Sequence, residues 1–259
     1  MISPMFRQLR LAEIGDTIEL LRRYKSSGDL LEIGAGTGWQ SKVLSNAGYR
    51  VDAIDLPATT DISNHARNRE WPIRDYDGAH IPFADRSFDI IYSSNVLEHV
   101  VGLDTLTADM KRVLREDGVA VHLVPNSSWR VLSLLTYYPG QAVDMFRWLR
   151  RKPSTPTASD ASGSELSSRG LLAKAIHRLI PHAHGAKGTA LSEINRFSKA
   201  SWDAYFDTGG WEVLEYGDNG MLASGDYLVG SLFPMQLRRR LGRMTGGIAH
   251  VYVVKPRRA

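Results

Sequence analysis

The residues best suited to chemistry lie in a glycine-rich segment near the start of the chain. In LLEIGAGTGWQ, residues 30–40, an apolar run passes directly into Gly34, Gly36 and Gly38. Glycines at this spacing allow a tight turn and let a ligand lie against the backbone, where a side chain would intrude. The acid that precedes them, Glu32, suits a ligand with a positive amino group better than a ligand with two phosphates.

The spacing of these glycines argues against a dinucleotide site. A dinucleotide fingerprint has the form G-x-G-x-x-G, which would place its third glycine at Trp39. The pattern in this chain is E-x-G-x-G-x-G instead. A nucleotide-dependent oxidoreductase or epimerase, which would share the fold class, is therefore kept only as an alternative.

Two further acids follow at positions that suit a nucleoside. Asp55, which precedes Leu56, ends an apolar segment about twenty residues after the turn, where a carboxylate can accept from the ribose hydroxyls. Asp77 can accept from an adenine amino group, while backbone amides near Gly78 and Ala79 face the ring edge. Three such features in register favour a nucleoside site over a simple surface turn.

The segments that must hold these residues alternate between strand and helix patterns. Helical spacing predicts a leading helix over residues 6–24, with Leu9, Ile14, Ile18 and Leu21 as its buried stripe. The alternation that follows predicts a parallel sheet with helices on both faces. The predicted strands are 29–33, 50–54, 71–76, 88–93 and 119–124, and the predicted helices are 40–47 and 103–114.

The pattern changes after Pro125. Residues 129–152 have a helical spacing that Pro139 and Gly140 should interrupt. Residues 153–168 form a polar, low-complexity linker that we expect to be mobile.

The remainder of the chain should complete a single domain. Short helices are expected over residues 170–180 and 199–207, and the apolar runs from Trp211 and Ile248 are expected to supply the last two strands. The predicted parts are an N-terminal helix (1–27), a ligand-binding core (28–126), an insertion (127–198) and a C-terminal part (199–259).

Taken together, these motifs resemble those of class I S-adenosylmethionine (SAM)-dependent methyltransferases, of a methyltransferase type 11-like group similar to the quinone-biosynthesis methyltransferases. The resemblance covers residues 30–126. The segments that carry it are E-x-G-x-G-x-G at residues 32–38, the acid at 55, the D-(x)n-(I/L)-P-F turn at 77–83, SFDIIYSSNVLEHV at 87–100 and RVLREDGVAVHLVPN at 112–126.

The resemblance implies a doubly wound, seven-stranded, mostly parallel sheet of the Rossmann-like class I type, with SAM as cofactor and the insertion over the acceptor. It places Glu32, Gly34 and Gly36 at the methionine portion of SAM, Asp55 at the ribose and Asp77 at the adenine. The full predicted contact set is Glu32, Gly34, Ala35, Gly36, Gly38, Asp55, Leu56, Asp77, Gly78, Ala79, Ser94 and Asn95.

The catalytic demands on such a protein are modest. The sulfonium of SAM is an activated electrophile, so the protein mainly aligns the acceptor atom with the methyl group and excludes water. Where the acceptor is a hydroxyl or an acidic carbon, His99 or Glu98 is the candidate base. A hydrogen-bonded residue that caps the strand is the alternative for His99, and a non-catalytic SAM-binding accessory protein is the alternative for the whole chain.

No metal is predicted from the sequence. Some quinone O-methyltransferases bind a divalent metal through E-x-x-E-H, but Asn95 stands here in place of the first carboxylate. His182 and His184, with His177 nearby, suggest zinc, yet no cysteine or well-spaced carboxylate completes the set. We therefore expect these histidines to contact substrate or to belong to an ordinary loop.

Composition and charge set the remaining expectations. The absence of cysteine and of a leader-like N-terminus favours the cytoplasm. Basic clusters at 147–152, 238–243 and 255–258 suit phosphates or an anionic membrane face, or are simply solvated helix ends and a tail. No nucleic-acid partner is expected, because no N-P-P-Y-type motif follows the fourth strand and no added RNA or DNA domain is recognisable.

The acceptor is expected to be a small molecule, a glycan or a lipid-linked compound. The apolar side chains that follow the predicted core suit an acceptor lid, a peripheral membrane contact, or ordinary packing on the sheet. These side chains are Trp129, Leu132, Leu134, Leu135, Tyr137 and Tyr138.

Overall fold

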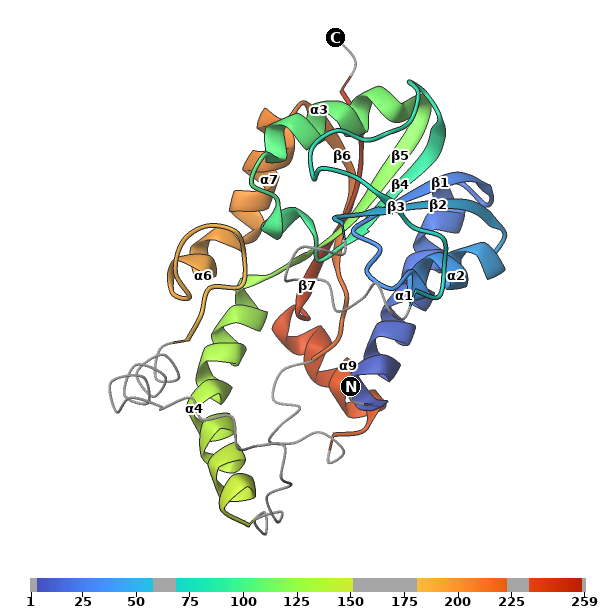
Figure 1. Cartoon of the computed structure of the whole chain (residues 1–259). Coiled ribbons are helices and arrows are strands. Elements are labelled where there is room, and N and C mark those ends of the chain that lie inside the picture. Colours follow the sequence, from blue (N-terminus) through green and yellow to red (C-terminus); the bar gives the residue numbers. More distant parts are fainter. Residues whose placement is uncertain (1–3, 58–68, 151–180, 223–232, 258–259) are drawn as a thin grey trace, which may run out of the picture.

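The described part of the chain forms one twisted sheet with helices on both faces (Figure 1). The structure is a computed structural model that describes residues 4–57, 69–150, 181–222 and 233–257. Its sheet has seven strands in the order β3-β2-β1-β4-β5-β7-β6. The strands are β1 (Gly28–Ile33), β2 (Tyr49–Asp55), β3 (Arg74–Asp75), β4 (Phe88–Ser94), β5 (Leu114–Pro125), β6 (Trp211–Asp218) and β7 (Ala249–Pro256).

Strand directions create a switch point in the middle of the sheet. β1 pairs in parallel with β2 on one side and with β4 on the other, so that Leu31 lies opposite Asp52 and Ile91. β7 runs antiparallel to both β5 and β6. Because the chain order reverses between β1 and β4, a crevice is expected beyond the carboxyl ends of these two strands, where open α/β sheets bind ligands.

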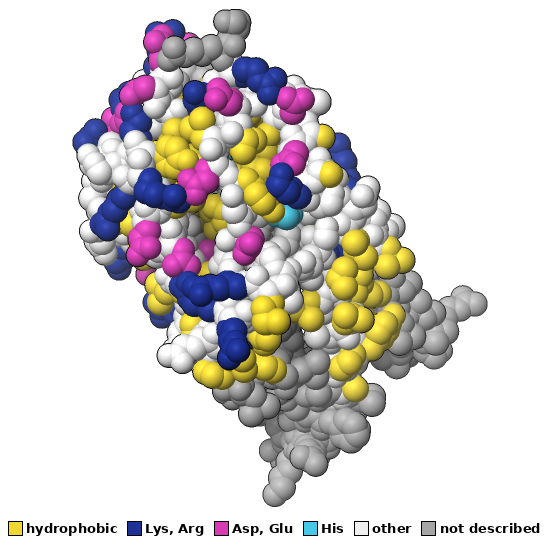
Figure 2. All heavy atoms as spheres, turned by 180° about the vertical axis from the view of Figure 1, so that it is seen from behind, with side chains coloured by type: hydrophobic (Ala, Val, Ile, Leu, Met, Phe, Trp, Pro, Cys, Tyr) yellow, Lys and Arg dark blue, Asp and Glu magenta, His cyan; other side chains and the backbone are white. Residues whose placement is uncertain are grey.

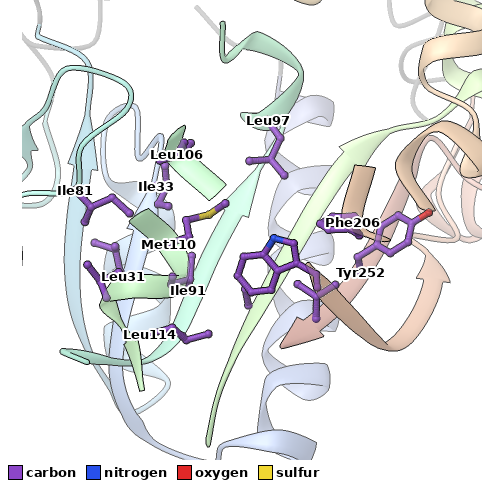
Figure 3. Close-up of a cluster of buried hydrophobic side chains, with 14 of the residues drawn as sticks. Leu31, Ile33, Ile81, Ile91, Leu97, Leu106, Met110, Leu114, Phe206 and Tyr252 are labelled. Carbon is purple, nitrogen blue, oxygen red and sulfur yellow. The ribbon is translucent and has the colours of Figure 1, made fainter. Parts of the chain in front are cut away.

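The period of two along each strand sends side chains to two separate helical layers. Helices α1 (Pro4–Tyr24) and α2 (Trp39–Asn46) pack on one face, where Leu30 and Ile90 are buried. Helices α3 (Leu103–Val113) and α7 (Lys199–Thr208) pack on the other face. Figure 3 shows the buried side chains of this second layer, with Met110 of α3 among residues of the central strands.

The predicted doubly wound, seven-stranded, mostly parallel fold is confirmed. The leading helix is also present, and its predicted stripe is buried, with Leu9, Ile14, Ile18 and Leu21 each 9% exposed or less. Predicted strand boundaries are shifted at two places. β3 is only two residues long, and β5 begins at Leu114, which pairs with Phe88, instead of at Val119.

The expected interruption at Pro139 is wrong. Helix α4 (Ser127–Arg150) runs without a break through Pro139 and Gly140. A proline removes one hydrogen bond to the carbonyl four residues earlier, here that of Leu135. Leu135 is 69% exposed, so solvent can satisfy that carbonyl and the helix continues. The predicted linker at 153–168 and helix at 170–180 lie outside the described residues.

The basic cluster near the C-terminus is partly structural. Helix α9 (Met235–Thr245) carries Arg238, which is 1% exposed and donates to the carbonyls of Phe233 and Leu222. The guanidinium of Arg239 forms an ion pair with Asp16 of α1. This cluster is therefore not simply the solvated helix end or the anionic-surface patch that its composition suggests. Within the described ranges, no helix has the length and apolar content needed to cross a membrane.

Candidate functional site

A glycine turn joins β1 to α2 at the switch point. Gly34, Gly36 and Gly38 all have positive φ, at +73°, +62° and +78°. The Gly34 and Ala35 amides donate to the Ile54 carbonyl of β2, at 2.9 and 3.2 Å, which fixes the turn to the neighbouring strand. A Cβ at Gly34 or Gly38 would overlap a neighbouring side chain, whereas nothing lies within 4 Å of a Cβ built at Gly36. Gly36 therefore faces open space.

That open space is part of a cavity of about 420 Å³, a size typical of small-ligand sites. Its walls come from α1, the glycine turn, the end of β4 and the segments that flank β7. The lining residues are Leu9, Arg10, Glu13, Gly34, Ala35, Gly36, Thr37, Trp39, Gln40, Ser94, Asn95, Trp129, His184, Asn219, Met221, Ile248 and Ala249.

The cavity brings together only part of the predicted contact set. Gly34, Ala35, Gly36, Ser94 and Asn95 line it. The other seven predicted residues lie outside its lining, and the three predicted carboxylates are among them. These seven are Glu32, Gly38, Asp55, Leu56, Asp77, Gly78 and Ala79.

Glu32 lies beneath the glycine turn. It is 1% exposed, and its carboxylate accepts a hydrogen bond from the Ser41 hydroxyl of α2. Burial raises the pKa of Glu32 to about 7, because a charge is poorly solvated there. A positive group brought into the cavity above the turn would favour the ionised form.

Asp55 and Asp77 stand on the β2 side of the turn. The two Asp55 carboxylate oxygens accept from the amides of Gly36 and Leu56, so Asp55 directly supports the glycine that faces the cavity. Asp77 is exposed and accepts from the amides of Ala79 and His80. These backbone hydrogen bonds, together with the His80 side chain, hold the pKa of Asp77 well below its usual value.

Sequence reasoning missed a polar group that α1 and the segment after β6 place on the cavity wall. Arg10 donates to the Ser94 hydroxyl at 3.0 Å and forms an ion pair with Glu13. The Asn219 amide nitrogen donates to Glu13 at 2.8 Å. A signal was present, since Glu13 lies four residues after buried Leu9 and therefore on the inward face of the helix.

The two candidate bases meet a third residue that the sequence did not connect to them. Glu98 and His99 lie on the short helix η2 (Leu97–His99) after β4, and His184 joins them from a segment far along the chain. Glu98 Oε1 lies 3.7 Å from His99 Nε2 and 3.8 Å from His184 Nε2. The expectation that no carboxylate accompanies His184 is therefore wrong: chain folding supplies Glu98, which sequence spacing could not reveal.

Burial shapes the protonation of this cluster. The Glu98 side chain is fully buried, and burial raises its pKa to about 8. Burial also lowers the pKa of His99, and it lowers the pKa of His184 to about 4. Both imidazoles are therefore neutral near pH 7 and can accept a proton or a metal ion.

A buried ion pair fixes the backbone of His184. The amides of His184 and Gly185 both donate to Glu193 Oε1 of α6 (Ser192–Arg196), each at 2.7 Å. Glu193 in turn pairs with Arg130 of α4 at 3.0 Å, where both side chains are almost completely buried. The predicted partner of His184, His182, is not in the cluster, and His177 lies outside the described residues.

A second hollow adjoins the cavity. It has a volume of about 310 Å³ and runs along α4. Trp129 and His184 line both hollows, so the two meet at these side chains, whose rings lie 4.7 Å apart. We name this second hollow the α4 groove. Its lining consists of Trp129, Arg130, Ser133, Leu134, Tyr137, Pro181, His182, Ala183 and His184.

The segment that contains the glycine turn, the β2 acid and η2 matches a known protein family. Residues 31–122 match the family described as "Methyltransferase domain". This match identifies residues 31–122 as a methyltransferase domain, similar to those of class I SAM-dependent methyltransferases. The matched residues include Glu32, Asp55, Asp77 and Glu98, whereas α4, His184 and the α4 groove lie beyond them.

Curated relatives support this assignment. The chain is 29% identical over 113 residues to a probable SAM-dependent methyltransferase of Mycolicibacterium smegmatis, and this alignment covers 44% of this chain and 41% of that protein. It is 30% identical over 95 residues to a demethylmenaquinone methyltransferase of Tropheryma whipplei, and this alignment covers 35% of this chain and 38% of that protein. The chain thus covers well under two thirds of the length of these relatives.

The fold extends further than the sequence similarity. The crystal structure of the PH0226 protein from Pyrococcus horikoshii aligns with a TM-score of 0.53 and 14% identity, over 99% of this chain and 93% of that chain. At that identity the likeness concerns the fold alone. The shared fold therefore includes β6 and β7, although the family match ends before them.

Proposed function

We propose that this protein binds SAM in the cavity beside the glycine turn and transfers the methyl group to a hydroxyl of a small-molecule, glycan or lipid-linked acceptor. The observation that carries the proposal is the turn itself. Gly36 faces the open cavity with a positive φ, and its amide is held by Asp55. The surroundings of this turn are compatible with the charged parts of SAM.

The charged side chains around the cavity fit the two ends of SAM. Arg10 lines the cavity and carries a positive charge that suits the methionine carboxylate. Glu32 beneath the turn suits the amino group. Asp55 accepts through both oxygens from backbone amides, yet a carboxylate has about four lone-pair directions, so capacity is left for a ribose hydroxyl. Asp77 and the neighbouring amides are the proposed adenine contacts.

The α4 groove is the proposed acceptor site. It shares the Trp129 and His184 side chains with the cavity, and its walls combine apolar, aromatic and polar side chains. Such a lining suits a sugar ring, or an apolar body that carries a hydroxyl. Val131, Leu135 and Tyr138 are exposed on the same helix. Figure 2 shows hydrophobic side chains in patches on both the upper and the lower half of the face that it draws. This surface favours a lipid-linked acceptor with peripheral membrane contact.

The main task of the protein in this reaction is to position the acceptor oxygen next to the methyl group of SAM. SAM supplies a methyl group already activated by a positive sulfur. The acceptor oxygen gains that methyl group and must lose its proton, and the sulfur keeps the electron pair of the broken C–S bond. His184 lines both the cavity and the groove, and Glu98 and His99 lie beside it; these three are the proposed groups that handle this proton. Positioning then provides most of the rate acceleration.

Calorimetric titration with SAM and S-adenosylhomocysteine tests the proposal. Asp55→Asn should weaken S-adenosylhomocysteine binding by roughly 10- to 100-fold, the effect of losing a charge-assisted hydrogen bond. Asp52→Asn, on the exposed side of the same strand, is the matched control and should bind normally. Failure of the folded wild-type protein to bind either compound would refute the proposal.

Turnover separates the enzyme from the alternatives. Release of S-adenosylhomocysteine in the presence of hydroxyl acceptors would exclude a non-catalytic accessory protein. Binding of a nicotinamide nucleotide that competes with SAM would instead favour an oxidoreductase or epimerase. The proposal requires the first result without the second.

A further inference from the structure

Glu98 is a buried carboxylate that lacks a hydrogen bond from any other residue that the structure describes. Its side chain is fully buried, and neither of its oxygens accepts a hydrogen bond from another described residue. His99 Nε2 and His184 Nε2 lie 3.7 and 3.8 Å from Glu98 Oε1, beyond hydrogen-bonding distance. A buried polar group in this state is costly, so its retention calls for a partner that the described residues do not supply.

Nearby charged side chains do not fill this role. Arg10 directs its guanidinium to Ser94 and Glu13. Arg130 directs its own to Glu193 and to the carbonyl of Ala190. Both arginines are thus engaged elsewhere, and a cation between the Glu98 carboxylate and the two imidazoles would meet the requirement.

The three side chains already have the spacing of a metal site. One ligand atom from each of Glu98, His99 and His184 can be chosen so that all lie within 4.8 Å of one another. In a tetrahedral zinc site with bonds of about 2.1 Å, ligand atoms are about 3.4 Å apart. The two Glu98 pairs, at 3.7 and 3.8 Å, would contract by a few tenths of an ångström on binding. The His99–His184 pair, within 4.8 Å, would contract by up to about 1.4 Å through rotation of the two partly exposed imidazoles. The imidazoles are 45% and 38% exposed, which gives an ion a path inward and leaves room for a further ligand.

The ligands are also held in place by their surroundings. The Ala186 amide donates to the Glu98 carbonyl at 2.9 Å, which ties the His184 segment directly to η2. Gly185 packs so closely that a Cβ there would lie 2.8 Å from the same carbonyl. Glu193 holds the His184 amide, and Trp129 packs against the His184 ring. Metal ligands are commonly oriented in this way by a supporting shell.

We propose that Glu98, His99 and His184 form a binding site for a divalent transition-metal ion of the zinc class. Two imidazole nitrogens and one carboxylate suit zinc and its neighbours better than magnesium or calcium, which prefer oxygen ligands. Three protein ligands leave at least one coordination position for water or a substrate oxygen. This proposal departs from the sequence-based prediction of no metal. Asn95 stands where the E-x-x-E-H motif has its first carboxylate, and His184, from a distant segment, supplies a ligand in its place.

The site borders the SAM cavity and the α4 groove through His184, which lines both. If the proposed function holds, an acceptor hydroxyl at the open position would coordinate the ion through the hydroxyl oxygen. The ion would lower the pKa of that hydroxyl and would help to orient its oxygen toward the methyl group. This role rests on the proposed function. Metal binding itself does not.

The test uses tag-free protein, freed of metal by a chelator and titrated with Zn²⁺ by calorimetry. One ion per chain should bind. Glu98→Gln and His184→Asn should each weaken binding by more than the roughly 10- to 100-fold typical of residues that only support a ligand. Glu98→Asp, which retains a carboxylate, should lose less. His182→Asn, two residues from His184 and outside the cluster, is the matched control and should bind as the wild type does.

Co²⁺ supplies a spectroscopic readout of the same site. The wild-type protein should give the intense visible absorption of a tetrahedral or five-coordinate centre, and His184→Asn should abolish it. Thermal unfolding and S-adenosylhomocysteine titration of each variant show whether it is folded. A folded wild-type protein that binds S-adenosylhomocysteine but no Zn²⁺ would overturn the metal site alone. Zn²⁺ binding without S-adenosylhomocysteine binding would overturn the proposed function alone. Equal Zn²⁺ affinity in all folded variants would also overturn the site.

Discussion

The two sides of the site are built in different ways. On the nucleoside side, the glycine turn and Asp55 are 19 residues apart in the chain and meet across one pair of adjacent strands. On the acceptor side, Glu98, Trp129, His184 and Glu193 come from four separate segments. The first is a local arrangement of backbone, and the second is a long-range arrangement of side chains.

This difference has an energetic consequence. Positive φ angles and strand register hold the nucleoside side, and a change there strains one turn. The acceptor side depends on the Arg130–Glu193 pair, whose two side chains are 7% and 0% exposed. Removing one member of such a pair leaves an uncompensated charge in the interior. Single substitutions on the acceptor side should therefore lower the stability of the protein more than those on the nucleoside side. Single substitutions on the nucleoside side should lower the cofactor affinity more.

The largest expected effect is on the acceptor side. Arg130→Met leaves the Glu193 carboxylate buried without its cation and should lower the free energy of unfolding by about 3–5 kcal/mol. It also removes the hydrogen bonds from Arg130 to the carbonyls of Ala190 and His182, which shape the segment around His184. Urea denaturation gives the stability change, and calorimetry on the folded fraction should find S-adenosylhomocysteine affinity nearly unchanged.

Two variants make this prediction decisive. Arg50→Met breaks an exposed ion pair with Asp29 and should leave stability nearly unchanged. The double variant Arg130→Met, Glu193→Leu removes both buried charges and should recover part of the loss. A single Arg130→Met variant as stable as wild type would show that the acceptor side does not depend on this pair.

The same contrast explains how far the sequence could predict the fold. The strands at Leu30 and Ile90 were predictable because burial on both faces leaves a short, mostly apolar run. The continuity of α4 through Pro139 was not, because it depends on whether solvent reaches the carbonyl of Leu135, which is a property of the folded surface.

Site residues follow the same division. Gly34 and Gly36 were identified because their spacing encodes a backbone shape. Arg10 was missed because its role depends on where α1 crosses the carboxyl end of β4. The meeting of Glu98 and His184, 86 residues apart, follows from no spacing rule and required the positions of η2 and α6. Seven of the predicted cofactor contacts, among them Glu32 and Asp77, do not line the cavity and stay predictions.

A smaller effect sharpens the comparison on the nucleoside side through pH. Burial raises the pKa of Glu32 from 4.5 to about 7, so the folded protein retains a proton that the unfolded chain loses first. Between pH 4.5 and 7 the free energy of unfolding should therefore fall as pH rises, by up to about 3 kcal/mol for this group. Glu32→Gln, which can still accept from the Ser41 hydroxyl, should lack this fall.

Denaturation curves of the ligand-free protein across that pH range measure the effect. Glu19→Gln, an exposed acid on α1, is the control and should follow the wild-type curve. Above pH 7, Glu32→Gln should be the more stable protein but should bind SAM less tightly, because the amino group of SAM loses a negative partner. Parallel pH curves for wild type and Glu32→Gln would show that Glu32 is ionised in the fold without penalty.

The smallest expected effect on stability isolates the glycine turn as a binding feature. Gly36→Ala places a methyl group at a φ of +62°, which costs about 1–2 kcal/mol, and adds no overlap because nothing lies within 4 Å of the new atom. Gly48→Ala is matched to it: its φ is +105°, its Cβ would also meet nothing within 4 Å, and it precedes β2 at the amino end, away from the cavity. Both variants should lose similar stability in urea denaturation, but only Gly36→Ala should weaken S-adenosylhomocysteine binding. If both retain wild-type affinity, the cofactor does not lie against this turn, and the local backbone arrangement would have a structural role only.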